Sequence, residues 1–155
     1  MSIIYFYRIF TFIFLIEIIT SSDYANLDIE NLDNELDASK EFWLIEFYSE
    51  KCSTCQEFSS IWVKLTKQVK YLKIGRVNID FPKGLNLATK IKALDNGIPW
   101  IRLYYGKNKF EDIMIGTEEP FPKPAKLKER IDNILSKKGK LQNGKYFIKL
   151  IFSYK

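Results

Sequence analysis

The feature that most constrains this chain is a hydrophobic segment that runs directly into two closely spaced cysteines. Residues 43–48 read Trp-Leu-Ile-Glu-Phe-Tyr, and this aromatic and β-branched stretch with one charge predicts a strand buried on both faces. After Cys52 and Cys55, apolar residues recur at helical spacing, at Phe58, Ile61, Trp62, Leu65 and Val69. A helix N-terminus offers unpaired N–H groups and the positive end of the helix dipole, which stabilise a thiolate. We therefore expect the chemistry of this chain at Cys52 and Cys55.

The composition removes several classes of catalytic site. The chain has 155 residues, of which 46% are hydrophobic, enough for one domain with its own core. It contains no histidine, which excludes Ser-His-Asp and Cys-His catalytic pairs. Two cysteines fall short of the usual four-ligand structural zinc site. We expect neither a metal nor a cofactor, and a zinc ion that bridges two chains is the remaining alternative.

The spacing of the cysteines favours a redox role over a structural one. A disulfide between Cys52 and Cys55 would close a loop of about four residues and stabilise the fold by roughly 2 kcal/mol, against about 4.7 kcal/mol for a 100-residue loop. Such a pair is a poor crosslink but can open and close easily. The alternative is a pair of reduced, inert core thiols.

The N-terminal segment predicts a targeting signal. Residues 3–19 are almost wholly apolar, broken by Arg8 and Glu17, and small residues follow at 20–22. Residues 1–22 are therefore interpreted as a secretory signal peptide, or alternatively as a retained signal anchor. Both interpretations bring the domain into an oxidising compartment, so the expected location is the endoplasmic reticulum or outside the cell.

Positive charge is concentrated at the C-terminal end. Residues 23–122 hold 13 Lys/Arg and 16 Asp/Glu, whereas residues 123–155 hold 10 and 2, a net charge of +8. We therefore expect a domain over 23–137 and a basic tail over 138–155, and no nucleic-acid partner, which would favour a basic face within the fold. The tail is interpreted as solvated or in contact with an anionic lipid surface. Its apolar residues 146–154 reach about 14 Å, too short for a ~30 Å bilayer core.

The remaining patterns predict alternating strands and helices. Strands are expected over 23–29, 71–80, 98–105 and 109–115, and helices over 32–38, from 81 to about 91, and over 125–137. The turn at residues 106–108 makes the last two strands antiparallel. This order predicts an α/β fold, a mixed central sheet with helices on both faces.

Three phrases carry a resemblance to a known family: Trp43-Leu-Ile-Glu-Phe-Tyr48, Cys52-Ser-Thr-Cys55, and Asn96-Gly-Ile-Pro99, whose proline follows Cys55 by 44 residues. Over residues 24–135 the chain resembles a thioredoxin-fold domain, and most closely the protein disulfide isomerases and thioredoxin-related transmembrane proteins. The resemblance implies an exposed nucleophile at Cys52 and a buried resolving thiol at Cys55. It also implies a cis-proline at Pro99.

The resemblance assigns two further parts of the site. The substrate groove would be formed by Pro99, Ile98, Trp100 and Lys51, with the backbone of Ile98 presented to an extended polypeptide. Glu46 would be a buried acid of raised pKa that moves the proton of Cys55. The alternatives are an ordinary proline at a strand start for Pro99 and, for Glu46, an exposed glutamate paired with a lysine.

The chain departs from the family pattern at the motif itself. Lys51 stands where a tryptophan usually precedes the first cysteine, and Ser53-Thr54 where isomerases carry Gly-His. Without a histidine beside the Cys52 thiolate, a reductase or isomerase is favoured over a strong oxidase. The sequence therefore predicts a thiol–disulfide oxidoreductase acting on protein thiols and disulfides. The alternative is a thioredoxin-fold module that binds polypeptides without catalysis.

Overall fold

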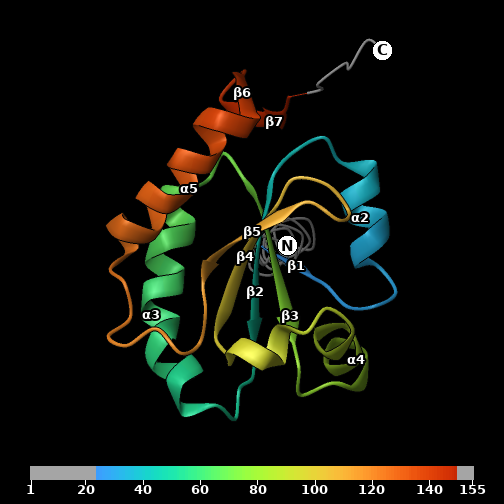
Figure 1. Ribbon diagram of the computed structural model, residues 1–155, viewed down its shortest axis with the longest axis vertical. Coiled ribbons are helices and arrows are strands. Elements are labelled where there is room, and N and C mark those ends of the chain that lie inside the picture. Colours follow the sequence, from blue (N-terminus) through green and yellow to red (C-terminus); the bar gives the residue numbers. More distant parts are fainter. Residues whose placement is uncertain (1–23, 150–155) are drawn as a thin grey trace, which may run out of the picture.

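Five strands form the central sheet of the computed structural model, which describes residues 24–149 (Figure 1). β2 lies in the middle of this sheet, parallel to β3 and antiparallel to β4. From one edge to the other, the strands are β1 (Ala25–Asn26), β3 (Lys73–Asn78), β2 (Trp43–Tyr48), β4 (Trp100–Tyr104) and β5 (Phe110–Met114). The first five residues of β2 are all buried, so the prediction of a strand covered on both faces is confirmed.

Helices cover both faces of the sheet, as the order of the elements predicted. α3 (Ser53–Gln68) and α5 (Pro124–Lys138) lie together on one face, and α2 (Leu32–Ala38) and α4 (Pro82–Lys90) lie on the other (Figure 1). A short 3-10 helix, η1 (Ala93–Asn96), leads from α4 to the loop before β4. The predicted α/β class, with a mixed sheet between two helical layers, is confirmed.

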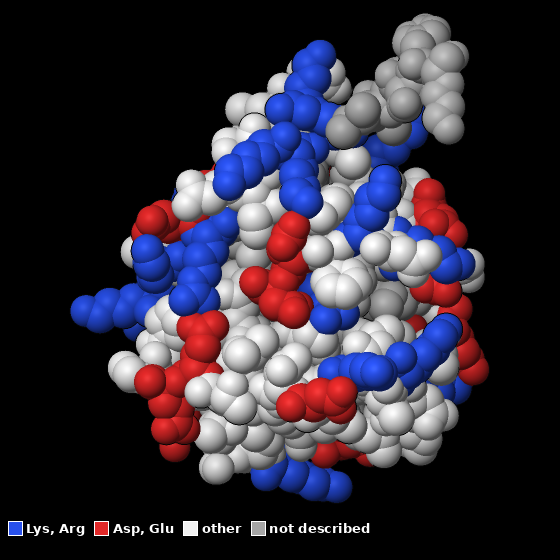
Figure 2. All heavy atoms as spheres, in the orientation of Figure 1, with Lys and Arg blue, Asp and Glu red and all other residues white. Residues whose placement is uncertain are grey.

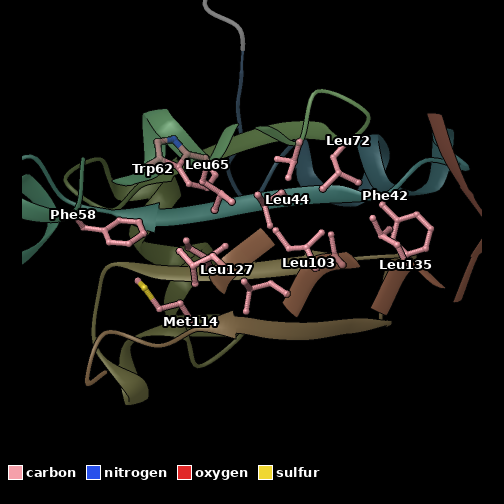
Figure 3. Packing of buried hydrophobic residues seen from close by; sticks show 14 residues of the cluster. Phe42, Leu44, Phe58, Trp62, Leu65, Leu72, Leu103, Met114, Leu127 and Leu135 are labelled. Atoms are coloured by element: carbon pink, nitrogen blue, oxygen red, sulfur yellow. The ribbon is translucent and has the colours of Figure 1, made fainter. Parts of the chain in front are cut away.

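The alternation of side chains in β2 divides the core into two clusters. Leu44 points toward α3 and α5, whereas Ile45 and its neighbours two residues away point toward α2 and α4, as expected for a strand of period two. Figure 3 shows the first cluster, in which the labelled residues from the sheet meet those of the two helices: Phe42, Leu44, Phe58, Trp62, Leu65, Leu72, Leu103, Met114, Leu127 and Leu135. Glu46 lies on the same side of β2 as Leu44, so the alternation directs a carboxyl group toward α3.

A β-hairpin follows α5 where the sequence analysis expected only a basic tail. β6 (Gly139–Gln142) and β7 (Lys145–Ile148) pair antiparallel around Asn143 and Gly144, both at positive φ. Asn-Gly is a strong signal for a two-residue hairpin turn, and the sequence analysis overlooked it. The Ile148 N–H donates to the Lys40 carbonyl at 2.9 Å, which ties β7 to the segment before β2.

The hairpin is also joined to the domain by packing. Tyr146 and Ile148 pack against the cluster beneath α3 and α5, and the Tyr146 ring lies 5.4 Å from that of Tyr71. Gly139 is required at the junction because a Cβ there would lie 2.8 Å from the Leu135 carbonyl oxygen. Lys and Arg side chains gather around this end of the molecule, which is uppermost in Figure 2.

Two predictions on targeting concern segments that the structure does not describe. The expected signal segment 1–22 and the last residues of the expected tail, from 150, lie outside residues 24–149. Within that range, no helix combines the length and the apolar character needed to cross a bilayer.

Candidate active site

Cys52 is the N-cap of α3, and its sulfur is held by the first turn of that helix. The Cys55 backbone N–H donates to Cys52 Sγ at 3.2 Å, and Thr54 Oγ1 lies 3.0 Å from the same sulfur. Partial burial acts to raise the pKa of the Cys52 thiol, but the hydrogen bonds from Cys55 and Thr54 outweigh it, so the pKa is lowered. Cys52 is half-exposed, and it therefore combines access with a stabilised thiolate.

Cys55 differs from Cys52 in both burial and acidity. It is 5% exposed and carries a free thiol, as Cys52 does. Burial raises the pKa of Cys55 to about 12, and its hydrogen bond to Cys52 and the charge of Glu46 act in the same direction. The pair thus consists of an accessible sulfur whose pKa is lowered and a buried sulfur that keeps its proton at neutral pH.

The loop before β4 places a backbone carbonyl beside Cys52. The Ile98–Pro99 peptide bond is cis, and the Ile98 carbonyl oxygen lies 3.9 Å from Cys52 Sγ and 3.3 Å from Thr54 Oγ1. Gly97 has a φ of 73°, and a Cβ on Gly116 would lie 2.4 Å from its carbonyl carbon. Glycine at position 116 therefore allows the loop after β5 to approach the Ile98 loop closely.

Trp100 occupies a different place from the one expected. It was assigned to the substrate groove with Ile98 and Pro99, but it is 1% exposed and packs against the Phe47 ring at 5.7 Å. Trp100 is the first residue of β4, and its side chain points into the cluster beneath α2 and α4. Its side chain is thus part of the core and does not line a groove. Lys51, which was also assigned to the groove, is exposed and directly precedes Cys52 in the chain.

A hydrogen-bonded turn between β2 and α3 sets the position of Cys52. Ser49 Oγ donates to Asp80 Oδ1 at 2.7 Å, and the Glu50 N–H donates to Asp80 Oδ2 at 2.8 Å. The Lys51 N–H donates to Ser49 Oγ at 3.0 Å. Neither Ser49 nor Asp80 was among the predicted site residues, although both stand at the ends of predicted strands.

Glu46 lies on the central strand with no exposure to solvent. Its Oε2 accepts a hydrogen bond from Arg76 Nε at 2.6 Å, and the two residues are direct neighbours across the parallel pair β2 and β3. Burial raises the pKa of Glu46 from 4.5 to about 7, although the Arg76 charge acts to lower it. The alternative of an exposed glutamate paired with a lysine is wrong, since β2 is central and the partner is an arginine.

Arg76 is in turn held by aromatic rings. Its guanidinium carbon lies 3.7 Å from the centre of the Tyr48 ring and 5.2 Å from that of Tyr24. Within residues 24–149, the second carboxyl oxygen of Glu46, Oε1, is buried without a hydrogen-bond partner. The carboxyl group thus keeps one oxygen that can accept or release a proton.

No group of three metal-ligating side chains occurs in the part of the chain that the structure describes. The site therefore consists of two sulfurs of unequal acidity, a backbone carbonyl beside them and a buried carboxyl of raised pKa. Such an arrangement is suited to thiol–disulfide exchange, in which one thiolate attacks and a second thiol is deprotonated later.

The part of the chain that contains these residues has counterparts among known proteins. A family model described as thioredoxin matches residues 23–128. The chain is 32% identical over 97 residues to a protein disulfide isomerase-like 2-3 of Oryza sativa subsp. japonica, covering 62% of this chain and 19% of that protein. It is 32% identical over 99 residues to the protein disulfide-isomerase A6 of Mus musculus, covering 63% and 22%.

Both relatives are much longer than the matched region, so this chain spans about a fifth of their length. Among solved structures, the thioredoxin f2 of Chlamydomonas reinhardtii superposes with a TM-score of 0.54 at 19% identity, covering 74% of this chain and 94% of that one. At this identity the superposition shows the fold alone, and the predicted thioredoxin fold is confirmed.

Proposed function

This chain belongs to the thioredoxin family, and from that premise we propose that it is a thiol–disulfide oxidoreductase acting on protein disulfides in the secretory pathway. One observation supports this proposal above the others. The pKa of Cys52 is lowered and that of Cys55 is raised, although the two residues share one turn of α3. Inert core thiols, the alternative interpretation, would both be buried, whereas Cys52 is half-exposed.

In the first step, the Cys52 thiolate attacks one sulfur of a substrate disulfide. A bond forms between Cys52 and that sulfur, the substrate S–S bond breaks, and the second substrate sulfur leaves as a thiolate that takes a proton from water. In this proposal Ile98 and Pro99 form the groove that holds the polypeptide, because the Ile98 carbonyl lies beside the attacking sulfur.

In the second step, Cys55 loses its proton and attacks Cys52. The mixed disulfide breaks, Cys52 and Cys55 become a disulfide, and the substrate sulfur that was bonded to Cys52 leaves as a thiol. The substrate has then gained two electrons and two protons. The cysteine pair has given up both electrons and the Cys55 proton, and water has supplied the other proton. We assign the proton transfer to Glu46, because its pKa of about 7 leaves much of it ionised as a base at neutral pH.

We favour a reductase or isomerase over a strong oxidase. Ser53 and Thr54 carry no imidazole to stabilise the Cys52 thiolate, so the reduced form gains less stability than in a motif with histidine. The energies involved are small, since a change of 30 mV in reduction potential corresponds to about 1.4 kcal/mol.

Insulin reduction with serine variants tests the proposal. Cys52→Ser is expected to abolish turnover, while Cys55→Ser is expected to accumulate mixed disulfides that gel electrophoresis without reductant detects. Ser59→Ala, an exposed position on α3 near the motif, is a matched control and should keep wild-type activity. Wild-type turnover by the double serine variant would refute the proposal.

The competing function is a polypeptide-binding module without turnover. It is favoured by Lys51, which replaces the aromatic residue that the resemblance places before the first cysteine. A fluorescent dithiol–disulfide assay separates the two functions. Turnover at the rate of a known oxidoreductase domain rules out the module, whereas binding that does not depend on the redox state of the cysteines supports it.

The location and the lipid contact are also proposals. A signal at residues 1–22 would direct the domain to the endoplasmic reticulum or out of the cell. Contact with anionic lipid would involve Lys137, Lys140 and Lys149, which are exposed, whereas Lys138 and Lys145 are paired with Glu111 and Glu41. Sedimentation with vesicles that contain phosphatidylserine, before and after all three exposed lysines are changed to glutamine, tests this contact.

A further inference from the structure

The Thr54 hydroxyl lies between the reactive sulfur and the carbonyl of the proposed groove. Its oxygen is 3.0 Å from Cys52 Sγ and 3.3 Å from the Ile98 carbonyl oxygen, and these two acceptors lie 3.9 Å apart. A threonine hydroxyl has a single proton to donate, so it serves only one of the two acceptors at a time.

We propose that Thr54 is a positioning residue that couples the ionisation of Cys52 to the availability of the Ile98 carbonyl. When Cys52 is a thiol, its S–H donates to Thr54 Oγ1 and the hydroxyl donates to Ile98. When Cys52 is a thiolate, it is the stronger acceptor, and the hydroxyl turns to the sulfur. The Ile98 carbonyl then loses its internal donor and is free to accept a backbone N–H from a polypeptide.

The consequence is that the groove accepts a polypeptide best when the nucleophile is charged. This deepens the proposed function and rests on it, since the polypeptide is the disulfide-bearing substrate. The arrangement depends on a short side chain with a hydroxyl group at position 54. The isomerase motif that this chain resembles carries histidine at this position and therefore lacks the hydroxyl.

Other groups act on the same sulfur and limit the expected effect. On α3, the Cys55 N–H and the Cys55 thiol also stabilise the negative charge of the Cys52 thiolate. The positively charged Lys51 directly precedes Cys52 in the chain. From β2, the charge of Glu46 raises the pKa of the neighbouring Cys55 thiol. The loop before β4 contributes the neutral Ile98 carbonyl. Removing the Thr54 hydroxyl should therefore raise the pKa of Cys52 but should not prevent the thiolate from forming.

The first test is the pH dependence of Cys52 alkylation by iodoacetamide. Thr54→Val keeps the shape of the side chain and removes the hydroxyl, and the midpoint is expected to rise by about one pH unit, the order of one hydrogen bond to a charged group. Thr54→Ser should restore the wild-type midpoint. Thr66→Val is the matched control, because Thr66 lies on α3 away from the site and its hydroxyl donates to the Val63 carbonyl. A Thr54→Val midpoint equal to that of the wild type overturns the proposal.

The second test measures the coupling itself. The reduced protein is titrated with insulin B chain whose thiols have been alkylated, at one pH below and one pH above the Cys52 midpoint. The wild type is expected to bind more tightly at the higher pH, by about threefold or more. Thr54→Val should show a smaller difference, because the only donor left to its Ile98 carbonyl at this site, among the described residues, is the Cys52 thiol at 3.9 Å. An equal pH dependence in the two proteins overturns the coupling.

Neither test requires turnover, so the proposed role of Thr54 and the proposed function can fail separately. If insulin is reduced without Cys52, the proposed function fails whatever the titrations show. If Thr54→Val leaves alkylation and binding unchanged while Cys52→Ser abolishes reduction, the function stands and the role of Thr54 is wrong.

Discussion

The central sheet carries two arginine–carboxylate pairs that differ in which member is buried. In the Glu46–Arg76 pair the acid is fully buried and the arginine partly exposed, with 17% of its side chain accessible. In the Arg102–Asp112 pair the arginine is buried and 36% of the acid side chain is accessible. Arginine keeps its proton in proteins, whereas a buried carboxyl group can exchange one.

Aromatic packing does not distinguish the two pairs, because Arg76 and Arg102 both lie against aromatic rings. The Arg102 guanidinium carbon lies 3.8 Å from the centre of the Trp100 ring and 3.6 Å from that of Phe110, so both of its neighbours contribute packing. The pairs differ in their acids: within the described residues Glu46 Oε1 is buried without a hydrogen-bond partner, whereas the Asp112 side chain is partly exposed to solvent. We infer that the pair beneath α3 is suited to moving a proton and the pair on β4 and β5 to holding strands together.

The largest expected effect that separates the two pairs is on catalysis. Glu46→Gln removes the proposed base, and the release of product from the mixed disulfide should slow by about 10²- to 10⁴-fold, the usual contribution of general base catalysis. Single-turnover quenching at pH 8 measures this step. Asp112→Asn makes the same chemical change in the other pair and should leave the rate unchanged. Equal rates in the wild type and Glu46→Gln would contradict the division between the pairs.

The second effect is on the pH dependence of stability. Because the pKa of Glu46 is raised from 4.5 to about 7, the folded state holds this proton more tightly than the unfolded state. The contribution to stability is therefore full below pH 4.5 and is lost as the pH rises to 7, by an amount on the order of 3 kcal/mol. Glu46→Gln should lack this loss. In urea unfolding, its free energy of unfolding should therefore rise relative to that of the wild type between pH 4.5 and 7. A constant difference across that range would mean that Glu46 stays charged when buried.

The smallest effect is expected from the pair on β4 and β5. Arg102→Met removes the guanidinium stack while Asp112 remains hydrated, and the free energy of unfolding should fall by about 1–2 kcal/mol. Urea unfolding at pH 7 measures this loss. The Cys52 alkylation rate should not change, and a shift of that rate would show that the second pair also acts on the site.

Features set by short segments were predictable from the sequence. The buried strand, the cysteines at the start of α3 and the acid at Glu46 each follow from residues within about a dozen positions. The Arg76 partner depends on the register between two strands, which the alternation of apolar residues in 71–80 did not determine. The role of Thr54 depends on a loop 44 residues away, although Thr54 itself stands within the motif.

Two errors have physical explanations. Trp100 was assigned to the groove because it adjoins Pro99, but it is the first residue of β4, a strand whose residues are all buried, so its side chain lies in the core. The hairpin at 139–148 was missed because the lysines around it suggested a solvated tail, while the Asn143-Gly144 signal was overlooked. In both cases the structure follows a local rule: a residue in a strand covered on both faces is buried, and Asn-Gly forms a hairpin turn.

The bond between β7 and Lys40 has a practical consequence for experiments on this domain. β7 lies beside the start of β2, and Cys52 follows the end of β2, so a strand of about 20 Å separates them (Figure 1). A label, bead or fusion partner joined after Lys149 would thus be attached at the end of the domain opposite Cys52. The reactive sulfur would remain turned toward the solution, which makes immobilised protein suitable for capturing substrates as mixed disulfides.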